Sequence, residues 1–342
     1  MSNQLRITVI GNGSWGTTLA CTFAKAGRRV TLLVRSAEEA QTLRAAGENS
    51  RYLPGVRLPP ELTLEHDPAR GLAACAVLLL AVPSQTLRAN VEALREHLPA
   101  DVVLLSCAKG FERGTLLRMS EVISVAAQVN PERVGALSGP NIAREVNEGK
   151  PAVSVVATYG PAAARTAQAL LTSSLLRIYT SDDVIGVELA GTLKNIIAIG
   201  AGISDGMQAG DNAKAAFMTR GLAEIARLGV VLGAHPLTFA GLAGLGDLVA
   251  TCASPHSRNR RLGAALAEGL SLMEAQERLG QVAEGVTTVL TARELAARAG
   301  IEMPVTEQLH AILFQGKNPR AAITELMQRE VKSEFEGLTG LF

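Results

Sequence analysis

The chain contains few cysteine, histidine and aromatic residues, on which disulfide-bonded, metal-binding and nucleic-acid-binding proteins depend. Its four cysteines, at positions 21, 75, 107 and 252, form no CxxC pair and lie in apolar segments, which is typical of reduced thiols and predicts no structural disulfide. The five histidines are scattered without metal-ligand spacing, so we expect no metal site. Aromatic residues make up 3% of the chain and the formal net charge is +1, which leaves neither the stacking surface nor the basic field that nucleic-acid binding requires.

Signals for a membrane or for export are also missing. The longest uninterrupted apolar run, Leu72 to Val82, is much shorter than the ~20 residues that a membrane helix needs. Residues Met1 to Arg6 lack the charged and apolar regions of a signal peptide. We therefore expect a soluble, cytoplasmic protein without membrane insertion, and its 342 residues are close to the usual size of two domains.

A glycine-rich sequence near the start, GNGSWG, is the first motif that points to a ligand. It follows a short apolar strand and precedes an alanine-rich amphipathic helix, Thr17 to Ala26. In this context GxGxxG indicates a dinucleotide site, because Gly11 permits a tight turn, Gly13 lets a pyrophosphate approach the backbone and Gly16 allows close helix packing. The helix that starts near Ser14 offers its first N–H groups to the phosphates.

The end of the second predicted strand bears on the choice of cofactor. NAD-preferring sites carry an Asp or Glu about 20 residues after the glycines, where it binds the ribose 2′-hydroxyl, but this chain has Val34-Arg35 there. An arginine suits a 2′-phosphate, so we predict that NADPH is preferred and that NADH is possible. The alternative for Arg35 is a surface charge. Glu38 and Glu39 are interpreted as a solvated helix start.

Strand-like and helical segments alternate over residues 1–180. The strand-like segments are 6–11, 29–34, 77–82, 102–107, 133–137, 152–157 and 176–180. Apolar strands that alternate with helices predict a parallel sheet covered on both sides, the doubly wound Rossmann-type fold. After Ser181 the pattern is helical only, over 182–204, 211–232, 260–267, 271–279, 287–298 and 304–315. The sequence therefore predicts an α/β fold with a dinucleotide-binding domain at 1–180 and an all-helical substrate-binding and catalytic domain at 181–342.

Polar clusters follow three of the predicted strands. They are Pro83-Ser84-Gln85, Ala108-Lys109-Gly110 and Ser138-Gly139-Pro140-Asn141. Ligands of doubly wound folds bind at the carboxyl ends of the strands, so Lys109 is a candidate functional residue, although strand ends also carry incidental polar groups. The loop from Gly47 to Pro60 interrupts the alternation and is predicted to lie over the cofactor.

The first long helix of the second domain carries the strongest catalytic candidate. In Val187 to Ile203, Lys194 and Asn195 stand in a mostly apolar surface. An unpaired lysine in such surroundings has a depressed pKa, which suits proton transfer near neutrality, so Lys194 is the candidate general acid or base. The alternative is a lysine that snorkels to solvent or pairs with a carboxylate such as Asp205, eleven residues further along the helix.

The segment GLAGLGDLVATCASPHSRNRR, at 241–261, sets polar residues between glycine-rich turns. Arg258 can bind an anion through its fork of donors, and Ser257 and Asn259 can donate hydrogen bonds beside it. Asp247 and Thr251, four residues apart, share one face if the segment is helical. The alternative is a polar loop with ordinary helix caps.

Taken together, these residues resemble bacterial NAD(P)-dependent glycerol-3-phosphate dehydrogenases. The resemblance spans nearly the whole chain, and the later motifs are more specific than the glycine-rich turn. The motifs are GNGSWG, Asn49 with Tyr52-Leu53-Pro54, Ala108-Lys109-Gly110, Gly139-Pro140-Asn141-Ile142-Ala143, Glu188-Leu189-Ala190-Gly191 with Lys194-Asn195, and Gly244-Leu245-Gly246-Asp247-Leu248 with Ser257-Arg258-Asn259.

The resemblance implies a homodimeric enzyme that interconverts dihydroxyacetone phosphate and sn-glycerol 3-phosphate and supplies phospholipid synthesis. Lys194 would protonate the alkoxide, Lys109 and Asn195 would orient and polarise the carbonyl, and Asp247 and Thr251 would orient Lys194. The implied substrate contacts are Lys109, Gly139, Asn141, Lys194, Asp247, Ser257, Arg258 and Asn259. The implied cofactor contacts are Gly11, Gly13, Ser14, Trp15, Gly16, Arg35, Tyr52, Lys109, Ala143, Arg258, Val282 and Glu284.

One residue departs from the family pattern, and two other functions stay open at this point. The family commonly has Ser or Thr where this chain has Asn141, although asparagine can also donate and accept hydrogen bonds. A reductase of another hydroxy acid or of a hydroxyacyl thioester would share the architecture, and the latter would more naturally use a His-Glu pair. A nucleotide-binding sensor would keep the fold without the chemistry.

Overall fold

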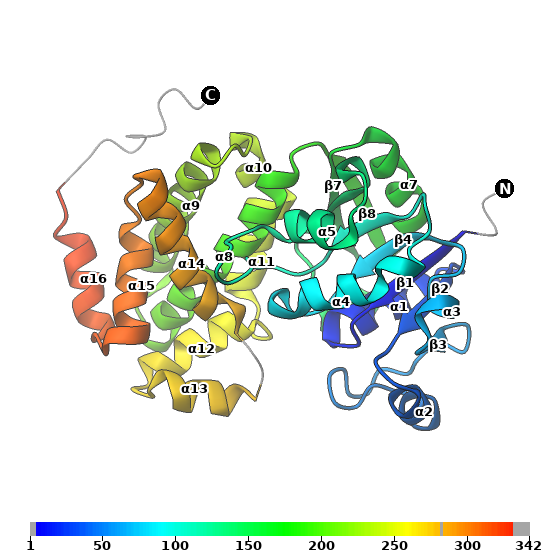
Figure 1. Cartoon of the computed structure of the whole chain (residues 1–342). Helices are drawn as coiled ribbons and strands as arrows, with labels where there is room; N and C mark the ends of the chain where they lie inside the picture. Colours follow the sequence, from blue (N-terminus) through cyan, green and yellow to red (C-terminus); the bar gives the residue numbers. More distant parts are fainter. Residues whose placement is uncertain (1–4, 281–282, 331–342) are drawn as a thin grey trace. The chain divides into compact units, whose positions relative to one another are not determined.

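The computed structural model describes residues 5–280 and 283–330. The chain divides into two compact units, one before and one after the junction of Val184 and Ile185. The first unit is built around a sheet and the second from helices (Figure 1). The predicted fold class, a Rossmann-type sheet followed by a helical part, is confirmed.

In the described part of the chain, eight strands form one mostly parallel sheet in the order β3-β2-β1-β4-β5-β6-β7-β8. Their bounds are β1 (Arg6–Ile10), β2 (Arg29–Leu33), β3 (Thr63–Glu65), β4 (Cys75–Leu80), β5 (Val103–Ser106), β6 (Val134–Ser138), β7 (Ala152–Thr158) and β8 (Leu176–Ser181). The order reverses between β1 and β4, where Ile7 pairs with both Val30 and Val77. Dinucleotides bind at the reversal in such sheets.

Two features of the sheet differ from the predicted alternation of parallel strands. β7 runs antiparallel to β6, with Ala136 opposite Ala157. A parallel return requires a crossover long enough to span the sheet, whereas the helix between these strands, α6 (Ala143–Asn147), has five residues. The edge strand β3 was not predicted, because three residues are too short to show a period.

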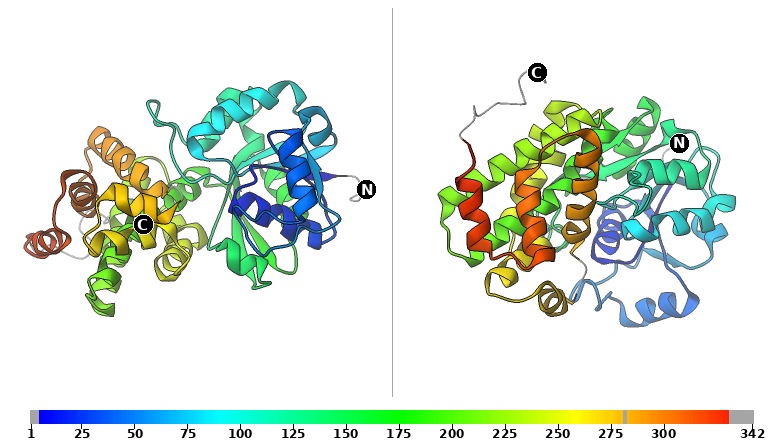
Figure 2. Two further views of the ribbon diagram at one scale, coloured as in Figure 1. Left: turned by 90° about the horizontal axis from the view of Figure 1, so that it is seen from below. Right: turned by 60° about the vertical axis from the view of Figure 1, so that its left-hand side comes forward.

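Helices cover both faces of this sheet (Figure 2). The side chains of Val77 and Leu79 point to one face and those of Leu78 and Leu80 to the other, and each set belongs to its own buried core. On the first face lie α1 (Ser14–Lys25), α2 (Ala37–Ala46) and α7 (Pro161–Leu171), and on the second lie α3 (Pro68–Gly71), α4 (Leu87–Leu94) and α5 (Met119–Ala127). Short 3-10 turns are η1 (Ser84–Thr86), η2 (Arg95–His97) and η3 (Pro131–Arg133).

The second unit is helical throughout its described residues. Its elements are α8 (Val184–Gly206), which begins at the last residue of the first unit, α9 (Asp211–Val231), α10 (Pro236–Ala240), the π-helical turn η4 (Leu242–Gly246), α11 (Asp247–Ala253), α12 (Arg258–Ala267), α13 (Leu272–Leu279), α14 (Glu284–Ala299), α15 (Pro304–Gln315) and α16 (Pro319–Met327). The sequence did not predict α10, η4, α11 or α16, since they are short and three of them lie in or beside the glycine-rich segment.

Among the described residues of this unit, two helical stretches are long and apolar enough to cross a membrane by length and composition alone. They are Val184–Gly206 and Pro236–Ala253. In α8, 94% of the most apolar window is buried, which is typical of the central helix of a globular core. In the second stretch, which joins α10, η4 and α11, the buried share is 39%.

Glycines let α8 and α12 meet backbone to backbone. A Cβ on Gly202 would lie 1.9 Å from the carbonyl oxygen of Arg260, and a Cβ on Gly263 would lie 1.9 Å from that of Ile199. No side chain fits at either point, so the two helices are held in one fixed register. This contact joins the helix of Lys194 to the helix that begins with Arg258.

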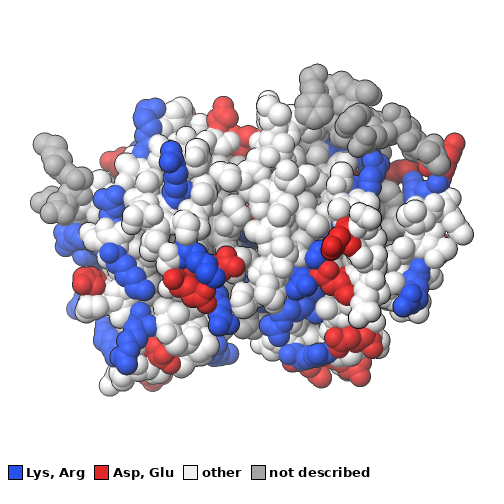
Figure 3. Space-filling view, turned by 180° about the vertical axis from the view of Figure 1, so that it is seen from behind, with Lys and Arg blue, Asp and Glu red and all other residues white. Residues whose placement is uncertain are grey.

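All four cysteines are buried free thiols. Burial raises the pKa of the thiols of Cys107 and Cys252 to about 12 and that of Cys21 to about 11. These thiols therefore stay protonated at neutral pH and are poor nucleophiles. On the face drawn in Figure 3, basic and acidic side chains are interspersed among uncharged ones over the described residues, in keeping with a net charge of +1.

Candidate active site

The glycine-rich turn after β1 has the shape that a dinucleotide requires. Gly11 has φ +98°, and a Cβ there would lie 2.5 Å from the carbonyl oxygen of Ala81 at the end of β4. A Cβ on Gly16 would lie 1.8 Å from the carbonyl oxygen of Gly11. Gly13 is the N-cap residue of α1 and has nothing within 4 Å of its Cβ position. The N–H groups of the first turn of α1 are therefore not blocked by a side chain at Gly13. These N–H groups and the space beside Gly13 fit a pyrophosphate.

This open position gives a first testable prediction. Gly13 has φ −67°, which alanine adopts without strain, and the added methyl group has room in the protein itself. We expect Gly13→Ala to leave the melting temperature unchanged but to weaken NADPH binding about 10- to 100-fold, because the methyl group would occupy the path of the pyrophosphate. Titration of NADPH fluorescence, with thermal unfolding as the stability control, measures both. Unchanged NADPH affinity would show that the phosphates do not approach Gly13.

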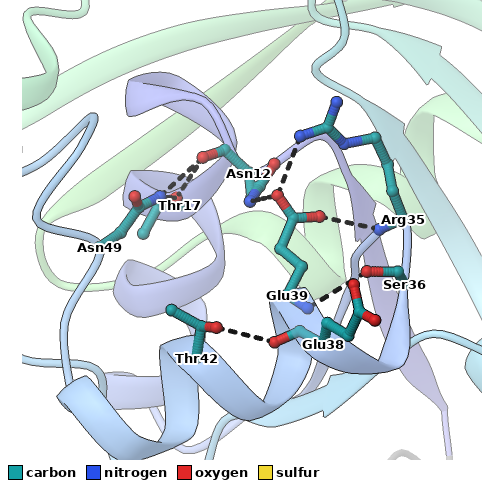
Figure 4. Close-up of polar contacts among 8 residues, drawn as sticks. All are labelled: Asn12, Thr17, Arg35, Ser36, Glu38, Glu39, Thr42 and Asn49. Atoms are coloured by element: carbon teal, nitrogen blue, oxygen red, sulfur yellow. Dashed lines mark hydrogen bonds and ion pairs between the residues drawn. The ribbon is translucent and has the colours of Figure 1, made fainter.

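Side chains from three segments brace the glycine-rich turn (Figure 4). The buried amide of Asn49 donates to the carbonyl oxygen of Asn12 (2.6 Å) and to the hydroxyl of Thr17 (2.9 Å). Thr17 also donates to the carbonyl oxygen of Asn12 (3.2 Å). Asn49 thereby fastens the 47–60 loop to the turn. Further along that loop, the guanidinium of Arg51 lies 5.1 Å from the centre of the Tyr52 ring.

Glu39 also reaches this turn. It lies in the first turn of α2, as predicted, but its side chain is only 20% exposed and is not solvated as expected. Its carboxylate accepts hydrogen bonds from the amide of Asn12 (2.8 Å), from the backbone N–H of Arg35 (3.0 Å) and from the Arg35 guanidinium (3.1 Å). Ser36 begins α2 by accepting from the backbone N–H of Glu39. The Ser-x-x-Glu spacing marks a helix start correctly, but it does not show that the glutamate side chain turns to the strand end.

The charges of the Arg35–Glu39 pair stabilise each other. Its hydrogen bond to Glu39 raises the pKa of the Arg35 guanidinium. Burial pushes the pKa of Glu39 up, but hydrogen bonds from Arg35 and Asn12 outweigh it and hold that pKa below the usual range. Glu39 is therefore a carboxylate at neutral pH. The Arg35 side chain is 77% exposed and that of Glu39 20%, so the guanidinium is open to an incoming anion.

The polar clusters at the carboxyl ends of β4 and β5 lie together. A Cβ on Gly110 would be 2.7 Å from the hydroxyl oxygen of Ser84. Gln85 donates to the carbonyl oxygen of Phe111 (2.7 Å) and accepts from the backbone N–H of Arg113 (3.1 Å). Lys109, the residue before Gly110, is half-buried in the β5–α5 loop.

The predicted ligand contacts that follow β6 or belong to α1 lie at the same edge of the sheet as the polar clusters after β4 and β5. Asn141 accepts from the hydroxyl of Ser154 (2.9 Å), so β7 holds its amide in place. Ala143 begins α6, which Asn147 ties to Thr18 of α1 (2.5 Å). Trp15 packs against the core of the first sheet face.

In the second unit, Lys194 lies at the centre of a buried polar cluster. Its ammonium donates to a carboxylate oxygen of Asp247 (2.6 Å) and to the hydroxyl of Thr251. Asp247 and Thr251 lie on one face of α11, and the Thr251 hydroxyl also donates to Asp247 (3.2 Å). Lys194 is 3% exposed and Asp247 2%, so the lysine does not snorkel to solvent. Lys194 is therefore paired with a carboxylate, which is the alternative considered from sequence, with Asp247 in place of Asp205.

Asp205, the carboxylate considered as a partner for Lys194, is engaged elsewhere. It accepts hydrogen bonds from Lys214 (2.8 Å) and from Arg260 (2.6 Å). These contacts join the end of α8 to α9 and α12. Asp205 therefore secures the helices, and the choice of Asp247 as the partner of Lys194 could not be made from helical spacing alone.

Asn195, the neighbour of Lys194, is oriented by a second asparagine. The amide of Asn259 donates to the side-chain oxygen of Asn195 (2.9 Å) and accepts from the backbone N–H of Gly285 (3.0 Å). Both asparagines are buried. Because the oxygen of Asn195 is occupied by Asn259, the group left to meet a ligand is its N–H₂ donor.

Arg258 is the first residue of α12, where its side chain is exposed. Ser257 caps the helix by accepting from the backbone N–H of Arg260 (3.3 Å), so the cap considered as an alternative for this segment is present beside the arginine. The guanidinium and the helix N-terminus together favour an anion. Of the remaining predicted cofactor residues, Glu284 begins α14 and Val282 lies outside the described residues.

The fold and these two sets of residues define a class of protein, the dinucleotide-dependent oxidoreductases. Family models of the NAD-dependent glycerol-3-phosphate dehydrogenase N-terminus and C-terminus match residues 6–164 and 183–324. The chain belongs to the family of NAD-dependent glycerol-3-phosphate dehydrogenases.

Relatives from several bacteria resemble the chain over almost its full length. A glycerol-3-phosphate dehydrogenase [NAD(P)+] of Corynebacterium glutamicum is 47% identical over 97% of this chain and 100% of its own. A second, from Salinibacter ruber, is 48% identical over 96% of both chains. The crystal structure of glycerol-3-phosphate dehydrogenase from Coxiella burnetii, 38% identical, superposes with a TM-score of 0.89 over 95% of this chain and 99% of its own.

Proposed function

We propose that the protein catalyses the reversible, NAD(P)H-dependent reduction of dihydroxyacetone phosphate to sn-glycerol 3-phosphate and so supplies phospholipid synthesis. Membership of the family supports the reaction. The buried cluster of Lys194, Asp247 and Thr251 is the observation that indicates which residues catalyse it. A buried ion pair costs desolvation energy, so a cluster of this kind needs a reason beyond stability. Proton delivery to a substrate oxygen is such a reason.

The nucleotide is assigned to residues 1–180. The open Gly13 and the uncapped first turn of α1 support this assignment. The residues proposed to hold it there are Gly11, Gly13, Ser14, Trp15, Gly16, Arg35, Tyr52, Lys109 and Ala143. Arg258 and Glu284, in the second unit, remain predicted cofactor contacts. A nicotinamide bound there would supply the hydride.

The proton is assigned to Lys194 in the domain 181–342. Its ammonium would protonate the oxygen that gains negative charge as the ketone is reduced, and Asp247 and Thr251 would hold that ammonium in position. Asn195, with its oxygen occupied by Asn259, would donate to the same substrate oxygen. Lys109, Gly139 and Asn141 remain predicted substrate contacts.

The substrate phosphate is assigned to Arg258. An exposed guanidinium at the N-terminus of α12 supports this, because the fork of donors matches phosphate oxygens and the helix N-terminus favours negative charge. Ser257 and Asn259 flank it, each with one remaining hydrogen to donate.

Three further proposals concern the cofactor, the assembly and the compartment. NADPH would be preferred over NADH, since the Arg35 guanidinium is exposed at the end of β2 where a 2′-phosphate would lie. The protein would work as a cytoplasmic homodimer, and the buried free thiols are compatible with a reducing compartment.

One assay tests the reaction, the phosphate site and the cofactor choice together. NADPH oxidation by the purified protein is followed with dihydroxyacetone phosphate and, separately, with unphosphorylated dihydroxyacetone and with NADH. We expect fast turnover only with the phosphorylated ketone and a higher kcat/KM for NADPH. Absence of turnover, with NADPH still bound, would point to another substrate or to a sensor.

A further inference from the structure

The sequence has no Asp or Glu at the end of β2, but in the structure the carboxylate of Glu39, from α2, lies at that place. The carboxylate of Glu39 accepts from the backbone N–H of Arg35, the residue that stands where the acid of NAD-preferring sites is expected. It also contacts Asn12, the second residue of the glycine-rich turn. Glu39 therefore lies between the strand end and the turn, which is the position from which an acid binds an adenosine ribose (Figure 4).

The same carboxylate is the partner of the guanidinium assigned to the 2′-phosphate. One oxygen of Glu39 accepts from both the Arg35 guanidinium and the Asn12 amide, while the other accepts from the Arg35 backbone. A 2′-phosphate that binds Arg35 has to share the guanidinium with this carboxylate and come close to a fixed negative charge. A 2′-hydroxyl carries no charge, and it can donate to the carboxylate.

We propose that Glu39 is a specificity-determining residue that limits the preference for NADPH over NADH. This inference rests on the proposed role of Arg35. Glu39 opposes the 2′-phosphate by competing for Arg35 and by charge repulsion, and it favours the 2′-hydroxyl as a hydrogen-bond acceptor. The chain thereby keeps both cofactors usable with one arginine and one glutamate, four residues apart on the chain.

The test removes the charge of Glu39 and compares two ligand fragments that differ only in the 2′-phosphate. The variant is Glu39→Gln, which keeps the size of the side chain. Its matched control is Glu38→Gln, which removes an equal charge from the adjacent, exposed residue, whose carboxylate has no hydrogen bond within the described chain. Binding of 2′,5′-ADP and of 5′-AMP to each protein is measured by calorimetry, and kcat/KM is measured with NADPH and NADH.

In Glu39→Gln we expect the affinity ratio of 2′,5′-ADP to 5′-AMP, and the NADPH-to-NADH ratio of kcat/KM, to rise about tenfold, whereas Glu38→Gln changes neither more than about twofold. If Glu39 has a purely structural role, Glu39→Gln would weaken the binding of both fragments equally and leave the ratios unchanged, which would overturn the proposal.

The variant Arg35→Ala separates this result from the proposed function. If Arg35→Ala leaves the ratios unchanged, the arginine does not bind the 2′-phosphate and the proposed cofactor preference fails. If it lowers the ratios while Glu39→Gln has no effect, only the role of Glu39 fails.

Discussion

Lys194→Met is expected to lower kcat at least ~10³-fold while NADPH binding stays within about twofold of the unchanged protein. Methionine keeps the length and the apolar stem of the side chain but cannot donate the proton that the developing alkoxide needs. The nucleotide residues proposed on the first unit are untouched, so cofactor binding should persist. Stopped-flow reduction of dihydroxyacetone phosphate and titration of NADPH fluorescence measure the two quantities separately.

The variant removes the ammonium that is paired with the buried carboxylate of Asp247, which typically costs about 3–5 kcal/mol of folding free energy. The double variant Lys194→Met with Asp247→Asn also removes the carboxylate charge, and we expect it to recover stability but not turnover. Lys214→Met is the matched control, because Lys214 also forms an ion pair with a carboxylate, that of Asp205, in the same unit. Turnover near the normal rate in either Lys194 variant would exclude Lys194 as the proton donor.

Arg258→Gln is expected to lower kcat/KM for dihydroxyacetone phosphate by about 10²- to 10³-fold, since truncating one partner of a charge-assisted contact costs about 2–5 kcal/mol. The slow reaction of unphosphorylated dihydroxyacetone should fall much less, because it has no phosphate to bind and can lose only the contact that Arg258 is proposed to make with the cofactor. Steady-state kinetics with the two ketones make this comparison.

The control for Arg258→Gln is Arg261→Gln, which removes the same charge from the next turn of α12, where the side chain is also exposed. We expect it to keep normal kinetics with both ketones. Equal losses on the two ketones in Arg258→Gln would mean that the arginine supports the helix or the cofactor rather than the substrate phosphate.

Sequence reasoning reached the fold class because its signals are local. The period of apolar residues and the glycine-rich turn are set by neighbours along the chain, and they predicted the sheet and most of the helices. The antiparallel β7 was not predicted, because strand direction depends on how the chain returns after β6. The short elements α10, η4 and α11 have too few residues for a helical period.

In the site, the residue types could be predicted from the sequence pattern, but the partner of Lys194 could not. Lys194, Asp247 and Thr251 stood out because charge is rare in apolar surroundings. Helical spacing offered Asp205 as an alternative partner, whereas the family resemblance implied Asp247 and Thr251, which are the residues that contact Lys194 in the structure. Glu39 was missed for the opposite reason, since a glutamate in the first turn of a helix is ordinary. Its contact with Asn12 joins residues 27 positions apart, and no local pattern carries that information.

The glycine contact between α8 and α12 has a consequence for which substrates fit. Lys194 is carried by one of these helices and Arg258 by the other, and no side chain separates the two backbones near Gly202 and Gly263 that could repack to change their spacing. With the roles proposed for Lys194 and Arg258, a substrate that presents its oxygen to the lysine and its phosphate to the arginine would have to match a fixed spacing of two helix backbones. Helix packing would then select the number of carbons between the carbonyl and the phosphate, so changing the substrate's chain length would require remodelling the scaffold rather than the residues that touch the substrate.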